Sequence, residues 1–116
     1  MSNKLAPKYQ NPVEFALSVL NGKWKASLIE HLEGGPLRFG QLRARMPRLS
    51  DKILVEKLRE LEERGFVERC GKEERGRPHT AYRLSSRGLS LLPVYWTLER
   101  WGEHMATEFG IEFSDA

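Results

Sequence analysis

Residues 50–64 read SDKILVEKLRELEER, and their apolar residues recur at the spacing of an amphipathic helix. At about 100° per residue, one side carries Leu54, Leu58 and Leu61 with Ile53 at its margin, and the other carries Lys52, Glu56, Arg59 and Glu63. Ser50 is a good N-cap, Asp51 suits the positive end of the helix dipole, and Gly65 can end the helix. We predict a helix with one buried and one open face, a pattern that also fits an ordinary surface helix.

A shorter helix is predicted directly upstream. Residues 37–39 are long enough only for a bridge-like strand, and a helix from about Gly40 to Met46 follows. The segment Pro47-Arg48-Leu49 breaks the chain before it restarts at Ser50. Two short helices separated by a tight break predict a helix-turn-helix.

After Gly65 the pattern changes from helix to strand. Residues 66–72 and 80–84 are short and contain Val, Tyr and Thr, which favour strands. Between them lies a turn-rich loop, and residues 71–79 together predict a hairpin with a basic tip. A helix-turn-helix followed at once by such a hairpin, or wing, indicates a winged helix.

Residues 1–10 show no periodicity, and we expect a flexible N-terminal arm followed by a single domain over residues 11–116. The first helix should begin at Asn11, because Asn is a good N-cap, Pro12 fits the first helical position and Glu14 stands three residues after the cap. It should stop at Asn21.

Two further helices are expected over residues 23–33 and from Ser85 or Ser86 to Phe109, the latter kinked at Pro93. The fold class is therefore α+β, mostly α: a winged helix-turn-helix with N- and C-terminal dimerisation helices. A chain of this size can hardly cover its terminal apolar stripes alone, so we expect a homodimer. The expected interface residues are Val13, Leu17, Leu91, Tyr95, Leu98, Trp101 and Met105.

The composition is mildly basic, with 19 Lys and Arg against 16 Asp and Glu in 116 residues, a net charge of +3. This permits a polyanionic partner without requiring one. Cys70 is the single cysteine, which excludes an intrachain disulfide framework. No signal peptide and no apolar run near the roughly 18 residues of a membrane span are found, so we expect a cytoplasmic protein without membrane contact.

The chain resembles the HxlR family of bacterial winged-helix transcription regulators from about residue 11 to about residue 102. The shared features are Pro12-Val13-Glu14, Gly22-Lys23-Trp24-Lys25, Arg38-Phe39 with Leu42-Arg43, Pro47 to Ser50 with Lys52 and Leu54, Leu58-Arg59 with Leu61-Glu62 and Gly65, Tyr82-Arg83-Leu84-Ser85 with Gly88, and Leu91-Leu92-Pro93 with Trp101-Gly102. The resemblance implies a homodimer, joined through N- and C-terminal helices, that binds operator DNA as an activator or repressor.

The chain departs from the family at two positions. Asn11 stands where many members carry a cysteine, which some use as a thiol switch, so we expect no switch there. Gly40 replaces the usual serine before the short third helix, a tolerable cap. Cys70 is expected to be a buried, inert thiol, with a reactive thiol beside Arg69 as the alternative.

Residues 50–64 hold four cations against five acids, a net charge of −1, so phosphate affinity should come from flanking segments. We expect phosphate contacts from Lys23, Lys25, Arg38, Arg43 and Arg48, and from Arg75 and Arg77 in the wing, which would lie on the flanking backbone or in the minor groove. The helix itself should lie in the major groove, starting at Ser50, with Lys52 and then Arg59 reading base edges and Val55 meeting a thymine methyl.

A winged helix used as a protein-interaction module without DNA binding is the alternative, because the C-terminal half of this helix is acidic. The chain shows no catalytic motif, and His31, His79 and His104 lie in separate elements without metal-ligand spacing, so we expect no enzyme, cofactor or metal site. Glu99 and Glu103 fit a solvated helix face. The operator sequence, the sign of regulation and any effector stay open.

Overall fold

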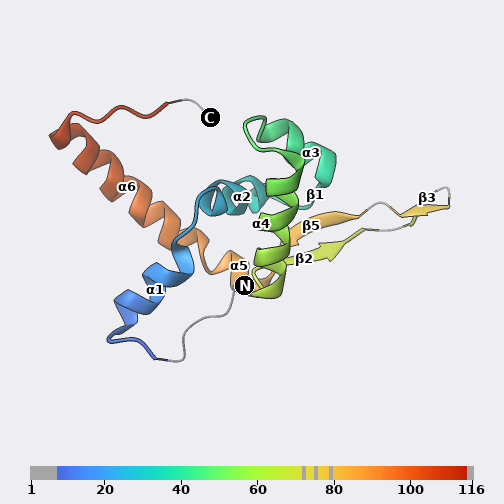
Figure 1. Cartoon of the computed structure of the whole chain (residues 1–116), viewed down its shortest axis with the longest axis horizontal. Coiled ribbons are helices and arrows are strands. Elements are labelled where there is room, and N and C mark those ends of the chain that lie inside the picture. The colour runs from blue at the N-terminus through green and yellow to red at the C-terminus, as the bar shows by residue number, and fades with distance from the viewer. Residues whose placement is uncertain (1–7, 72, 75, 79, 115–116) are drawn as a thin grey trace.

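The computed structural model describes residues 8–71, 73–74, 76–78 and 80–114. Its elements are α1 (Pro12–Leu20), α2 (Lys25–His31), the 3-10 turn η1 (Leu32–Gly34), β1 (Leu37–Arg38), α3 (Phe39–Arg45), α4 (Asp51–Glu63), β2 (Val67–Cys70), β3 (Glu73–Glu74), β4 (Arg77–Pro78), β5 (Ala81–Leu84), α5 (Ser86–Leu89) and α6 (Leu92–Phe109). The wing projects from one end of the molecule, and α1 and α6 lie at the other (Figure 1). The predicted fold class, a mostly helical winged helix-turn-helix, is confirmed.

The sheet is antiparallel, with strand order β1-β5-β2. Leu84 pairs with Val67 near the base of the wing, and Ala81 pairs with Cys70 farther out. The outer part of the wing is a separate two-stranded ladder, in which Glu74 and Arg77 are paired in the backbone register. The predicted hairpin is therefore present, with β2 and β5 shorter than the segments 66–72 and 80–84.

The core forms because each helix turns its apolar stripe inward. On α4, Leu54, Leu58 and Leu61 are all buried, as the periodicity predicts. They pack in one cluster with residues of α2 and the sheet, among them Leu28 and Val67. Burial of each leucine contributes about 1.5–3 kcal/mol relative to exposure.

The predicted ends of α4 and α1 are confirmed. The Ser50 hydroxyl accepts a hydrogen bond from the Ile53 amide at 3.1 Å, so Ser50 caps α4. Gly65 follows the helix at φ 82°, a left-handed conformation that glycine adopts without strain. In α1, the Asn11 side chain accepts from the Glu14 amide at 2.8 Å.

Three helices differ from prediction. α2 is shorter than residues 23–33, because it starts only after Trp24, at φ 77°, and passes into η1. α3 is capped at Arg38 rather than Gly40, and the Gln41 side chain accepts from the Arg38 amide at 2.8 Å. The expected kinked helix is instead two helices, α5 and α6, with Pro93 in the first turn of α6, where no amide donor is needed.

Two residues expected at the dimer interface belong to the core. Leu91 and Tyr95 are buried and pack with the residues that surround α4. Their assignment to the interface is wrong, because both side chains are buried in the core of the chain itself. Among the described residues, no helix combines the length and apolar character that a bilayer crossing needs.

Candidate nucleic-acid interface

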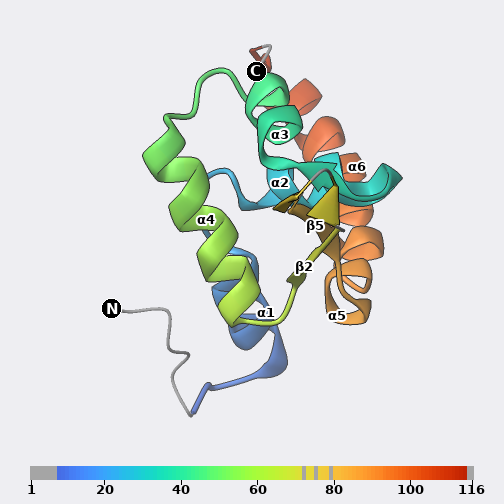
Figure 2. The same cartoon turned by 90° about the vertical axis from the view of Figure 1, so that its right-hand side faces the viewer.

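One face of α4 is open to solvent along its length. Lys52, Val55 and Arg59, three to four residues apart, are all exposed, whereas the leucines behind them are buried. α4 lies along one side of the molecule, with the sheet and α6 on the other side (Figure 2). The structure thus brings the three predicted base-reading residues together on one surface, which we call the α4 face.

The cations expected at phosphates are distributed around α4. Lys23, Arg38, Arg43 and Arg48 are exposed. The Arg43 guanidinium pairs with the carboxylate of Asp51 in the first turn of α4, so it also fixes α3 against α4. Arg75 lies outside the described residues, and the side chain of Arg77 in β4 is not described.

Lys25 is not available to DNA, which corrects the prediction of a phosphate contact. Its residue is only 4% exposed, and its ammonium nitrogen lies 2.6 Å from Glu60 Oε2 on α4. The helix that follows Trp24 points this side chain into the protein rather than toward solvent. Lys25 is therefore a structural partner of α4.

The acids of α4 are largely neutralised within the chain. Besides Glu60 with Lys25, Glu62 accepts from Arg69 at 2.9 Å and Asp51 pairs with Arg43, so these acids have partners outside the helix. Burial acts to raise the pKa of Glu60, but the Lys25 hydrogen bond and neighbouring positive charges outweigh it and lower the pKa. The acidic half of α4 holds the helix to α2 and the wing.

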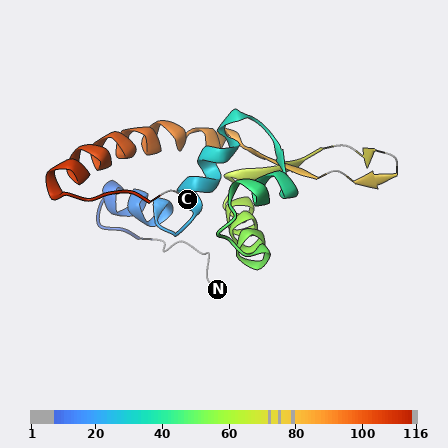
Figure 3. The ribbon, with the colours of Figure 1, turned by 90° about the horizontal axis from the view of Figure 1, so that it is seen from above.

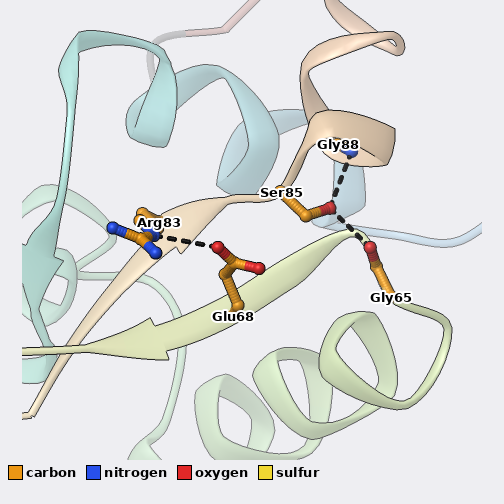
Figure 4. A network of polar contacts seen from close by, with 5 residues as sticks. All are labelled: Gly65, Glu68, Arg83, Ser85 and Gly88. Carbon is orange, nitrogen blue, oxygen red and sulfur yellow. Dashed lines mark hydrogen bonds and ion pairs between the residues drawn. The ribbon is translucent and has the colours of Figure 1, made fainter.

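A polar network fixes the wing relative to α4 (Figure 4). The Ser85 hydroxyl donates to the Gly65 carbonyl at the end of α4 and accepts from the Gly88 amide at 3.0 Å. Glu68 and Arg83 pair across β2 and β5 at 2.9 Å.

Neighbouring contacts close the same corner of the fold. Arg87 donates to the Arg64 carbonyl at 2.7 Å, and a Cβ at Gly88 would lie 2.1 Å from the Phe66 carbonyl oxygen. Sequence reasoning missed these positioning residues, because the partners are up to 23 residues apart. The serine preceding a short helix was their only local signal.

The terminal helices expose a large apolar surface. Val13 is 67% exposed and Trp101 63%, and Leu17 and Leu98 are also exposed, while Met105 is half-buried. Leu17 and Leu98 line the same hollow between α1 and α6. We call this surface the α1–α6 face. Phe109, Ile111 and Phe113, which the prediction did not include, are also exposed.

Cys70 and the histidines do not form a metal site within the described residues. Cys70 is half-buried on β2, so the expectation of a buried thiol is only partly met. Burial and the nearby Arg45 charge lower the pKa of His31. Among the described residues, no group of three His, Cys, Asp or Glu side chains is placed to hold a metal ion; His79 lies outside those residues.

A winged helix whose helix α4 has one face open to solvent is the arrangement found in helix-turn-helix DNA-binding proteins. The profile of the HxlR-like helix-turn-helix family matches residues 19–109, and the chain belongs to this family. It is 37% identical over 108 residues to the uncharacterized HTH-type transcriptional regulator YtcD of Bacillus subtilis (strain 168), covering 92% of this chain and 85% of that protein.

Solved structures agree with this assignment. The redox regulator HypR in its reduced form matches with a TM-score of 0.73 and 37% identity, over 81% of this chain and 92% of that chain. A transcriptional regulator described as of the MarR family, from Enterococcus faecalis V583, matches with a TM-score of 0.76 and 34% identity, over 94% of this chain and 98% of that chain. The chain is thus a DNA-binding regulator by family.

Proposed function

We propose that this protein binds operator DNA as a homodimer in the cytoplasm, with one α4 in the major groove of each half-site and the wing, residues 71–79, on the flanking backbone or minor groove. The α4 face carries the proposal: it is exposed, lacks apolar bulk apart from Val55, and is backed by buried leucines. Such a helix enters the major groove with its N-terminal residues at the base edges.

Reading and holding fall to different residues. Lys52, near the capped start of α4 at Ser50, suits a guanine edge, and Arg59 reaches the same groove two turns on. Val55 suits a thymine methyl. Lys23, Arg38, Arg43 and Arg48, with Arg75 and Arg77 from the wing, would hold phosphates on either side.

Dimerisation through the α1–α6 face would set two α4 helices at a fixed distance. Val13, Leu17, Leu98, Trp101 and Met105 supply the apolar contact. Exposed apolar patches of this kind mark interaction sites on soluble proteins. A symmetric pairing of this surface places the two wings away from the interface, as a two-fold operator requires.

Regulation by the family's thiol switch is not proposed for this chain. Asn11, where many members carry cysteine, caps α1 through its side-chain oxygen and forms no thiolate. Cys70 is the last residue of β2, and the wing extends away from α1 and α6 (Figure 1). A disulfide between two such residues would need their Cα atoms within about 7 Å of each other.

Fluorescence anisotropy with labelled random duplex DNA tests DNA binding against the protein-interaction alternative. We expect binding that weakens with salt, and Arg48→Ala should reduce the slope of log K against log salt by about 0.9, one phosphate contact. Arg100→Ala removes another exposed arginine, on α6, and should leave the slope unchanged. Absence of binding at low salt, or equal slopes for both variants, would favour the interaction module.

A further inference from the structure

A cavity of about 620 Å³ lies between α2, α6 and the C-terminal tail. This volume falls within the range of small-molecule sites. Sequence reasoning gave no sign of it, because it forms only where two helices some 60 residues apart in sequence come together, with Glu30 on α2 facing Glu99 and Glu103 on α6.

The lining combines apolar walls with unbalanced negative charge. Leu20, Ala26, Leu98 and Phe113 supply apolar surface, and Tyr95 adds an aromatic ring. The charged side chains that line it are three carboxylates, and the described residues of the lining include no Lys, Arg or His.

None of these three carboxylates forms an ion pair with another described residue. Partial burial raises the pKa of Glu30, and repulsion from Glu99 and Glu33 raises it further. The uncompensated carboxylates of this cavity repel an anion. A neutral ligand would leave their negative charge unbalanced. A monovalent cation with an apolar body satisfies both parts of the lining.

We propose that this cavity binds a small hydrophobic organic cation, such as an aromatic quaternary ammonium, with its charge between Glu30 and Glu99 and its apolar body against Leu20, Ala26 and Phe113. Aromatic rings such as Tyr95 add cation–π attraction to such ligands. A hydrated metal ion would leave the apolar walls without a partner.

The C-terminal tail turns back along α6 (Figure 3), and Phe113 of this tail lines the cavity. Gly110 ends α6 at φ 70°, and the Ile111 amide donates to the Ala106 carbonyl at 2.8 Å, which reverses the chain. Phe113 then lines the cavity while it remains 70% exposed, so it stands at the rim. A ligand would bury this ring.

The site is linked to α4 through a single short helix. α2 presents Ala26 and Glu30 to the cavity and, through Lys25, pairs with Glu60 on α4. Occupancy that shifts α2 therefore shifts the α4 face. This second step, a change in operator affinity, rests on the proposed function, whereas binding of the cation does not.

Isothermal titration of the full-length protein with benzyltriethylammonium tests the site without DNA. We expect saturable binding of one probe per chain and little binding of 3-phenylpropionate, which has a similar body and the opposite charge. Glu30→Gln with Glu99→Gln should weaken binding about tenfold or more, because about 1.4 kcal/mol of charge attraction is lost. Glu108→Gln, on α6 but outside the lining, should bind like wild type.

Absence of binding, equal binding of the anion, or an unaltered affinity in the double variant would overturn the proposal and leave the cavity to a second copy of the chain. Saturating probe should also change operator affinity in wild type and not in the double variant. If probe binds and operator affinity stays constant, the link through α2 is wrong. If the protein does not bind DNA in the absence of the probe, the proposed function is contradicted instead.

Discussion

The Lys25 ammonium lies 2.6 Å from the Glu60 carboxylate and joins the start of α2 to the C-terminal half of α4. Their side chains are 5% and 16% exposed, so the pair is largely withdrawn from water. Buried pairs of this kind are costly to break, because removal of one partner leaves an uncompensated charge inside the protein.

Lys25→Ala should therefore destabilise the fold by about 3 kcal/mol, the lower end of the range for buried pairs, since Glu60 keeps some contact with solvent. Urea unfolding measures this change. Lys52→Ala, an exposed lysine on α4, should change stability by about 0.5 kcal/mol or less. Lys25→Met combined with Glu60→Leu should recover much of the loss; equal effects of Lys25→Ala and Lys52→Ala would show that the pair contributes nothing.

The two perturbed glutamates predict opposite pH effects. The pKa of Glu60 is lowered in the folded state, so its pairing stabilises the protein above the ordinary glutamate pKa and is lost as pH falls through the folded value. The pKa of Glu30 is raised in the folded state, so its ionised carboxylate destabilises the protein at pH values above the folded-state pKa. Below the ordinary glutamate pKa the carboxyl group is protonated and this destabilisation is absent.

Glu30→Gln should accordingly raise the melting temperature at neutral pH, and the gain should vanish in acid below the ordinary glutamate pKa. Thermal unfolding across this pH range provides the measurement. Glu108→Gln is the matched control, because Glu108 is exposed on α6 and does not line the cavity. A gain in melting temperature that persists in acid would show that the effect of Glu30→Gln does not come from removing the carboxylate charge.

Gly88 allows α5 to lie directly against the chain after α4. Because a Cβ there would lie 2.1 Å from the Phe66 carbonyl oxygen, Gly88→Ala should destabilise by about 1–3 kcal/mol, as overpacking does. Gly40→Ala in α3 meets nothing within 4 Å and should stabilise by about 0.5–1 kcal/mol. Chemical denaturation of the two variants compares them, and similar values would contradict the packing described here.

The α1–α6 face predicts the oligomeric state. Wild type should sediment as a dimer at micromolar concentration, and Leu98→Glu should shift it toward monomer, because a charge would be buried at the interface. Leu89→Glu changes another exposed leucine, on α5 and away from that face, and should leave the dimer intact. A monomeric wild type would exclude the proposed interface.

Lys52 separates reading from holding. Lys52→Ala should weaken binding to a selected operator by about 1–3 kcal/mol and leave random duplex binding nearly unchanged. Arg75→Ala with Arg77→Ala should instead weaken binding to all duplexes and reduce the salt slope. Competition anisotropy measures the affinity for both DNAs. Equal losses of affinity on both DNAs for Lys52→Ala would show that Lys52 contacts the DNA phosphates rather than a base.

Local patterns predicted much of this fold, because caps and stripes act within a few residues. Ser50, Gly65 and the leucines of α4 are examples. Lys25 could not be placed from sequence, since its partner lies 35 residues later and only packing shows that the side chain is buried.

The same limit applies to the C-terminal helix. An apolar stripe does not tell a core from an interface, so Leu91 and Tyr95 of the core and Leu98 of the surface look alike in sequence. Pro93 is compatible with a kink and with a new helix start. The separate short helix α5, capped by Ser85, ends before Pro93, so Pro93 lies in the first turn of a new helix. Glu99 and Glu103, which line the cavity, likewise fit a solvated helix face in the sequence.

Selection of bound sequences from random duplex DNA tests the central claim most directly. A homodimer that reads DNA through α4 should enrich an inverted repeat whose half-site centres lie about 10 base pairs, or a multiple of that spacing, apart. Lys52→Ala should lose preference at one position in each half-site. Recovery of random sequences by wild type, or of the same repeat at full strength by Lys52→Ala, would contradict base reading by this helix.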